Sequence, residues 1–206
     1  MGDREKNSHQ EIVSAAVRLF MRKGYNTTSV DEIAEAAGLT KGGLYYYIEK
    51  KEDLLTAIHD EFMDALFAKL NGVIKADAEP RDNLFSWIRA QTEIVKDYKP
   101  HIKIFITEID HYPRDTFERM VEKRDLAQAM FNSIIVAGIE AKQIREDIDP
   151  KIISFLVFGM INWMFVWYRP EGTLSIGEIT ENINKLVLTG IMLPQALPQE
   201  VRQEVG

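Results

Sequence analysis

One stretch of this sequence decides the fold: SVDEIAEAAGLTKGGLYYYIEKKED, residues 29–53. It contains two short helical patterns separated by the segment 38–40, and the second pattern carries three consecutive tyrosines at positions 45–47. A single amphipathic helix would not be interrupted in this way. Two short helices that meet at a tight turn are typical of a helix-turn-helix, whose second helix can enter the DNA major groove.

The two helices have recognisable ends. Ser29 and Glu32 have the spacing of a capping box, in which each side chain bonds an otherwise free amide at the start of a helix. Gly38 is expected to end that helix in a backbone conformation that other residues adopt at a cost. Thr40 is the expected N-cap of the second helix, which should run to about Ile48.

The spacing within the second helix separates an inner and an outer face. Leu44, Tyr45 and Ile48 share the apolar face, which we expect to be buried. The residues left facing outward are Lys41, Gly42, Gly43, Tyr46 and Tyr47.

The pair Gly42 and Gly43 is unusual at the start of a helix, since each glycine costs about 1 kcal/mol relative to alanine. One interpretation is that DNA must approach this backbone closely, because a lysine precedes the pair and tyrosines follow it. The other is that the pair only frays the first turn. The first interpretation is favoured.

Composition limits the kind of DNA contact. The net charge is −7, and residues 1–60 hold eight Lys or Arg against ten Asp or Glu, so this part is no basic module. Binding must therefore depend on a few placed cations and neutral donors. Because the chain contains no cysteine and its first ten residues lack an apolar segment, we expect neither disulfides nor a secretory signal, and a cytoplasmic location.

Residues 12–55 resemble the N-terminal DNA-binding domain of the TetR family of transcriptional regulators. Gly43 stands where the family often has threonine, serine or alanine, and Tyr46 stands where histidine is frequent. These departures bear on which operator is read. The positions that match in register are Phe20, Gly24, 28–30, Ile33, Ala34, Ala37, Gly38, Thr40, Lys41, Gly42, Leu44, Tyr45, Tyr47, Lys51, Leu54 and Leu55.

The resemblance implies binding to double-stranded DNA at a palindromic operator. The positions that it implies at the DNA are Thr28, Ser29, Thr40, Lys41, Gly42, Gly43, Tyr45, Tyr46, Tyr47 and Lys51. Lysine can donate to guanine, and tyrosine hydroxyls are common phosphate donors, which agrees with these roles. The spacing of Tyr45 also fits an ordinary core aromatic.

The rest of the chain reads as helices only. We find no strand pattern and no internal repeat, and we expect an all-α protein of about nine helices. The expected domains are a helix-turn-helix DNA-binding domain in residues 1–51, a helical effector-binding and dimerisation domain in residues 52–193, and a frayed tail in residues 194–206. The long helix from Glu52 would link the two domains.

The helix expected over residues 150–168 is apolar on nearly every face, and its longest apolar run, residues 155–168, is shorter than the roughly 18 to 20 residues that span a bilayer. It therefore needs burial on more than one side, and a second copy of the chain can cover one of them. Together with the last helix, it predicts a homodimer through the last two helices, as the resemblance also implies. The alternative is a central core helix of a monomer.

The second half is rich in methionine and aromatic residues, a composition that is more often core than pocket. The resemblance, however, implies a small hydrophobic effector, and a weaker likeness to the subset that responds to fatty acids or acyl-CoA suggests its class. Asn162 is a candidate for orienting the effector or for a hydrogen bond across the dimer. The expected effector-binding residues are Met120, Arg124, Phe131, Phe158, Asn162 and Trp163.

Enzyme interpretations have little support. Glu108 and His111 have the spacing of half a di-iron site, but no second such pair exists. We find no nucleophile elbow and no spaced metal motif, so we expect no catalysis, metal or cofactor. The competing function is a helical lipid-binding carrier with a non-functional DNA module.

Overall fold

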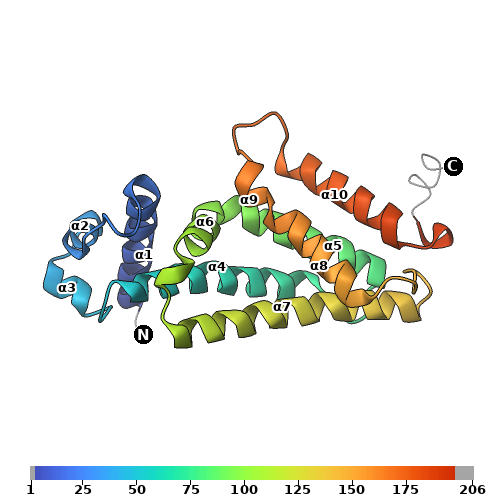
Figure 1. Ribbon diagram of the computed structural model, residues 1–206, viewed down its shortest axis with the longest axis horizontal. Coiled ribbons are helices and arrows are strands. Elements are labelled where there is room, and N and C mark those ends of the chain that lie inside the picture. Colours follow the sequence, from blue (N-terminus) through green and yellow to red (C-terminus); the bar gives the residue numbers. More distant parts are fainter. Residues whose placement is uncertain (1–2, 198–206) are drawn as a thin grey trace. The chain divides into compact units, whose positions relative to one another are not determined.

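The computed structural model describes residues 3–197, and within them the chain is all-α, as expected. The only extended pairing there is an isolated β-bridge between Ile144 and Met192. The expected nine helices are confirmed, with α9 continuing α8 after a break at Trp163. The elements are α1 (Asp3–Lys23), α2 (Val30–Ala36), α3 (Lys41–Tyr45), α4 (Glu52–Val73), α5 (Pro80–Asp97), α6 (Lys99–Thr107), η1 (Ile109–His111), α7 (Arg114–Glu140), α8 (Pro150–Asn162), α9 (Met164–Trp167), α10 (Ile176–Ile191) and η2 (Pro194–Ala196) (Figure 1).

The helices divide into two compact units. Unit 1 comprises Met1–Asp64 and Tyr98–Val121, and unit 2 comprises Ala65–Asp97 and Glu122–Gly206. These limits differ from the domain boundary after residue 51 that the sequence suggested. The reason is packing, because buried residues of α4 and of the segment 98–121 share one core with α1: Leu54, Leu55, Ile58, Ile104, Tyr112 and Met120.

Unit 1 holds the helix-turn-helix against α1. Gly24 and Gly38 both have positive φ, at +86° and +69°, and each follows the end of a helix, as expected. The capping box at Ser29 and Glu32 is present in full, and Thr40 caps α3. Helices α2 and α3 bury Ile33, Ala34 and Leu44.

The segment 98–121 ties α6, η1 and the start of α7 to the same unit. Tyr112 is buried and its hydroxyl donates to the carbonyl of Leu55 at 3.2 Å. Its pKa is raised, first by burial and then by nearby carboxylates, so the phenol stays protonated. His111 lies with its ring centroid 4.9 Å from that of Tyr25, the residue that follows the glycine turn after α1.

Unit 2 is centred on α5, which contacts α8, α9 and α10 (Figure 1). The fully buried ring of Trp87 lies 4.3 Å from Phe131 and 4.7 Å from Phe158, measured between centroids. The hydroxyls of Thr92 and Thr180 are 2.7 Å apart and join α5 to α10. A second complete capping box begins α10.

The end of α10 is fastened to the loop before α8. The amide of Arg145 donates to the carbonyl of Ile191 at 2.9 Å, and the amide of Leu193 donates to Gln143 at 2.8 Å. The expected tail therefore starts later than residue 194, because η2 follows at once and Leu197 is buried. Residues 198–206 lie outside the described part of the chain.

Two helical glycines of unit 2 give a matched test of this packing. A Cβ at Gly138 would lie 2.5 Å from Cδ1 of Ile144, whereas one at Gly72 would meet nothing within 4 Å. We expect Gly72→Ala to raise the free energy of unfolding by up to about 1 kcal/mol through helix propensity. Gly138→Ala should lower it by about 1–3 kcal/mol through overpacking. Urea denaturation measures both, and a stabilising Gly138→Ala would contradict this packing.

Candidate nucleic-acid interface and effector region

The start of α3 is open to solvent. The hydroxyl of Thr40 accepts a hydrogen bond from the amide of Gly43 at 3.1 Å, which fixes the first turn. Lys41 and Gly42 are exposed, and a Cβ at Gly42 would meet nothing within 4 Å. A partner can therefore approach the backbone at this point.

The three tyrosines point in directions that differ in part from the expectation. Tyr45 is 45% exposed, so its predicted place on the buried face is wrong, while Tyr46 is 74% exposed, as expected. Tyr47 is half-buried and packs against the core, with its ring centroid 5.2 Å from that of Tyr46. The reason is helical spacing: residues three and four positions after Leu44 lie on its side, and these are Tyr47 and Ile48.

Lys41 is held by a neighbour on α2 that sequence reasoning did not single out. Its ammonium lies 3.0 Å from Oδ1 and 3.1 Å from Oδ2 of Asp31, in the first turn of α2. The hydrogen bond from Lys41 and the charge of Asp31 raise the pKa of the lysine. No local sequence signal reveals this pair, since its members are ten positions apart and meet only when α2 and α3 pack together.

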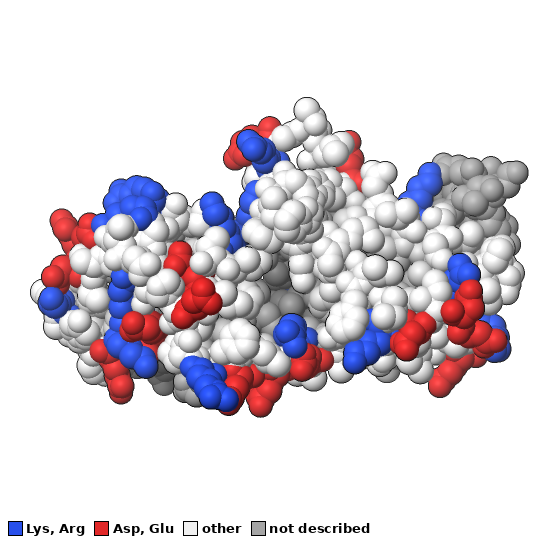
Figure 2. All heavy atoms as spheres, viewed as in Figure 1, with Lys and Arg blue, Asp and Glu red and all other residues white. Residues whose placement is uncertain are grey.

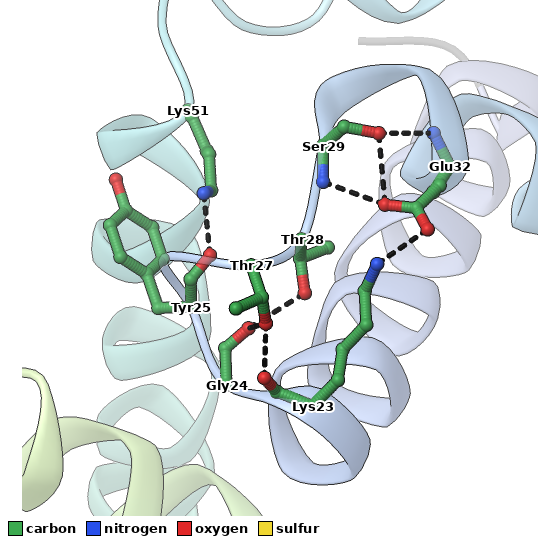
Figure 3. A network of polar contacts seen from close by, with 8 residues as sticks. All are labelled: Lys23, Gly24, Tyr25, Thr27, Thr28, Ser29, Glu32 and Lys51. Carbon is green, nitrogen blue, oxygen red and sulfur yellow. Dashed lines mark hydrogen bonds and ion pairs between the residues drawn. The ribbon is translucent and has the colours of Figure 1, made fainter.

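Thr28 and Lys51 already have internal partners, as Figure 3 shows. Thr28 is buried, and its hydroxyl donates to the carbonyl of Gly24 at 2.8 Å. The Lys51 ammonium donates to the carbonyl of Tyr25 at 2.5 Å and lies 4.0 Å from the centre of the Tyr25 ring. Burial lowers the pKa of Lys51. Both side chains therefore stabilise the turn that precedes α2.

Ser29 is exposed and belongs to a network that joins α1 to α2 (Figure 3). The Ser29 amide donates to Glu32 at 2.8 Å, and Lys23 at the end of α1 forms an ion pair with the same carboxylate. The hydrogen bond from Lys23, followed by those from Ser29, lowers the pKa of Glu32 to about 2. The carboxylate is thus charged at neutral pH and fixes the start of α2.

Charges of both signs are interspersed over α1, α2 and α3 on the face in Figure 2. This agrees with the count of eight cationic against ten acidic residues in positions 1–60. The face in Figure 2 therefore carries no basic stripe over these helices. Any DNA affinity must come from particular donors rather than from general attraction to phosphate.

Unit 2 exposes an apolar face on α8 and α9, formed by Ile152, Phe155, Leu156, Trp163, Val166 and Trp167. Figure 2 shows an uncharged surface over α8, and Lys151 is the only charged residue in positions 150–167. This stretch is apolar enough to count as a membrane-span candidate by length and composition alone, and 28% of it is buried. As expected, the core of the chain covers only one side of α8.

The expected effector residues fall into separate places. Phe131 and Phe158 meet around Trp87 in the interior of unit 2. Met120 is instead a core residue of unit 1. Among the others, Arg124 is exposed and bonds Asp125 at 2.8 Å, and Asn162 and Trp163 are exposed at the end of α8.

Buried donors without partners lie next to the aromatic pair. Trp87 and Gln91 are one turn apart on α5, and in the described chain neither Nε1 of Trp87 nor Nε2 of Gln91 has a hydrogen-bond partner. An unsatisfied buried donor costs about 1–3 kcal/mol. Sequence reasoning missed both residues, because a tryptophan and a glutamine on an amphipathic helix carry no local sign of missing partners.

Known proteins are similar to this chain over most of its length. It is 26% identical over 186 residues to the HTH-type transcriptional repressor KstR2 of Rhodococcus jostii (strain RHA1), covering 89% of this chain and 91% of that protein. It is 22% identical over 191 residues to the fatty acid metabolism regulator protein of Bacillus subtilis (strain 168), covering 91% and 97%.

Solved structures agree with this similarity. AibR in complex with isovaleryl coenzyme A and operator DNA matches with a TM-score of 0.77 and 25% identity, over 87% of this chain and 97% of that one. The family model for bacterial regulatory proteins of the tetR family matches residues 12–58. The model for the tetracyclin repressor-like C-terminal domain matches residues 77–191, more than half of the chain. The chain belongs to the TetR family of bacterial regulatory proteins.

Proposed function

We propose that this chain is a transcriptional repressor that binds a palindromic operator as a homodimer and is released by a small hydrophobic effector. The observation that carries the proposal is the outward face of α3. This helix buries only Leu44 and leaves Lys41, Tyr45 and Tyr46 exposed beside an open glycine backbone. Such a cluster is suited to the edges and phosphates of a DNA groove.

Each exposed side chain has a distinct role in this proposal. Lys41 donates to base edges, and Gly42 and Gly43 let the backbone come close to them. Tyr45 and Tyr46 donate from their hydroxyls to phosphates, as do Ser29 and Thr40 where their caps leave them accessible. Tyr47 contributes its half-buried ring as a support for Tyr46.

Thr28 and Lys51 act differently from a simple phosphate contact. Their polar groups bond the carbonyls of Gly24 and Tyr25. We assign them the positioning of the turn before α2, and through it the position of Ser29. This assignment keeps both residues in the DNA-binding function without requiring their internal bonds to break.

The homodimer is supported by the apolar face of α8 and α9. Exposed patches of this kind on a soluble protein commonly mark interaction sites. A helix-turn-helix needs two copies to read two half-sites about 34–36 Å apart. Asn162, exposed at the end of this face, would make a hydrogen bond across the dimer.

The proposed effector is an acyl-CoA, a thioester with an apolar acyl group. Two similar proteins support this class. The structure of AibR is a complex with isovaleryl coenzyme A, and the relative from Bacillus subtilis is a fatty acid metabolism regulator protein. Phe131 and Phe158 would receive the acyl group beside Trp87. The unpartnered N–H groups of Trp87 and Gln91 would donate to its carbonyl oxygen.

The proposed division of labour follows the domains expected from the sequence. Residues 1–51 bind DNA, and residues 52–193 bind the effector and dimerise. The protein would act in the cytoplasm, where its operator is. A gel shift with the DNA upstream of its own gene tests this function, because the absence of any shift at low salt would favour the lipid carrier.

Lys41→Gln should weaken operator binding by about tenfold, since one good lysine contact to guanine is worth about 1–3 kcal/mol. Lys75→Gln makes the same charge change in an exposed residue after α4 and should leave binding nearly unchanged. Fluorescence anisotropy with labelled duplex measures both. Equal losses in the two variants would argue against a base contact by Lys41.

Leu156→Glu should convert the dimer to a monomer at micromolar concentration, because it places a charge in the middle of the apolar face. Leu126→Glu is the matched control, since Leu126 is also exposed, at 55%, but lies on α7. Light scattering reports the mass of each. A wild-type monomer, or equal dissociation of both variants, would remove the proposed interface.

Gln91→Leu should raise the free energy of unfolding by about 1 kcal/mol, because it removes an unsatisfied buried donor. It should also weaken the release of operator by acyl-CoAs. Thr92→Val is the control, since it breaks the bonded pair with Thr180 and should lower stability by about 1 kcal/mol. Urea denaturation and operator release by isovaleryl- to palmitoyl-CoA measure these effects. If acyl-CoAs release the operator from the Gln91→Leu variant as well as from the wild type, Gln91 does not bind the acyl carbonyl oxygen.

A further inference from the structure

The ion pair between Asp31 and Lys41 has no evident structural purpose. Both side chains are well exposed, at 63% and 58%, and exposed pairs of this kind contribute little to stability. Asp31 also places a carboxylate beside Lys41, the residue that is proposed to contact the bases of DNA. A carboxylate in that position repels phosphate and would lower affinity for DNA in general.

The ammonium and carboxylate of this ion pair match the acceptors and the donor that one kind of base pair offers in the major groove. In the major groove, guanine offers two acceptors, O6 and N7, and its partner cytosine offers the N4 amino group as a donor. O6 and N4 are joined by a Watson–Crick hydrogen bond and are therefore about 2.9 Å apart. The Lys41 ammonium and the nearer Asp31 oxygen are separated by 3.0 Å.

An A·T pair fits this arrangement less well in either orientation. With adenine in the place of guanine, the amino group replaces O6 beside the ammonium, which keeps only N7 as an acceptor, and the carboxylate faces the O4 acceptor of thymine. With thymine in that place, O4 and the adenine amino group match the ion pair, but a methyl group replaces N7, so Lys41 loses its second acceptor.

We infer that Asp31 and Lys41 together read one G·C pair in each half-site, with Lys41 on the guanine and Asp31 accepting from the cytosine amino group. This rests on the proposed DNA-binding function and adds a residue to it. Asp31 thus contributes selectivity at a cost in general affinity. It also orients the lysine before DNA arrives, since the ion pair exists in the free protein.

The experiment selects duplexes from a random-sequence pool with the full-length protein. It then measures the affinity of the selected site and of single-pair variants of it. Wild type should require G·C at one position of each half-site. Asp31→Ala should reduce the preference for G·C over A·T at that position by roughly tenfold, while its binding to unrelated duplex becomes tighter.

Glu35→Ala is the matched control, because Glu35 is an exposed carboxylate one turn further along α2. It makes the same charge change, so it should also tighten non-specific binding but keep every base preference. Lys41→Gln should lose the preference at the same position as Asp31→Ala. Circular dichroism of each variant checks that the helices are retained.

The outcomes separate the inference from the proposed function. If Asp31→Ala keeps all base preferences, or if Glu35→Ala loses the same one, the inference is wrong while operator binding stands. A wild-type preference for A·T at the position that responds to Lys41 would overturn it as well. If the wild-type protein enriches no sequence at all, the proposed function itself fails, and this inference with it.

Discussion

The DNA-facing surface depends on the burial of two very short helices. Helices α2 and α3 have seven and five residues, and isolated helices of this length are not stable in water. Ile33, Ala34 and Leu44 hold them against α1, and the caps at Ser29 and Thr40 satisfy their first amides. The exposed side chains of the site are therefore positioned by these few buried contacts and caps.

The stabilisation of this unit uses polar groups that could otherwise bind DNA. Lys23 is paired with Glu32, and Lys51 is bound to the carbonyl of Tyr25. Two lysines near the turn are thereby bound within the protein, whereas Lys41 is exposed and shares its charge with Asp31. A site with so few unpaired cations gains DNA affinity most readily when a homodimer presents two such sites. The charge pattern of unit 1 is thereby connected to the exposed apolar face of unit 2, which is the proposed dimer interface.

Local signals in the sequence predicted the helices and their ends well, whereas contacts between distant helices could not be predicted from the sequence. The capping boxes and the turns at Gly24 and Gly38 follow from backbone requirements within a few residues, so they could be read directly. The partner of Lys41, the internal bonds of Lys51 and the missing partners of Trp87 and Gln91 depend on which helices meet. Tyr45 was misplaced for a local reason: the residues three and four positions after Leu44 are Tyr47 and Ile48, and these take the buried side in its place.

The division of the chain also bears on how an effector could act. Helix α7 begins in unit 1, where Met120 is part of the core, and continues into unit 2, where Phe131 contacts Trp87. Helix α4 likewise has residues in both units. The two helices therefore link the proposed effector residues to the core of unit 1 through continuous backbone.

Within unit 1, the segment that includes the start of α7 touches the turn before α2. His111 lies against Tyr25, and Tyr112 bonds the carbonyl of Leu55. In the proposed function, a ligand that favours one position of α7 would act on the turn that Thr28 and Lys51 hold in place. It could shift the protein between a DNA-binding and a released state only by the difference between its affinities for the two states.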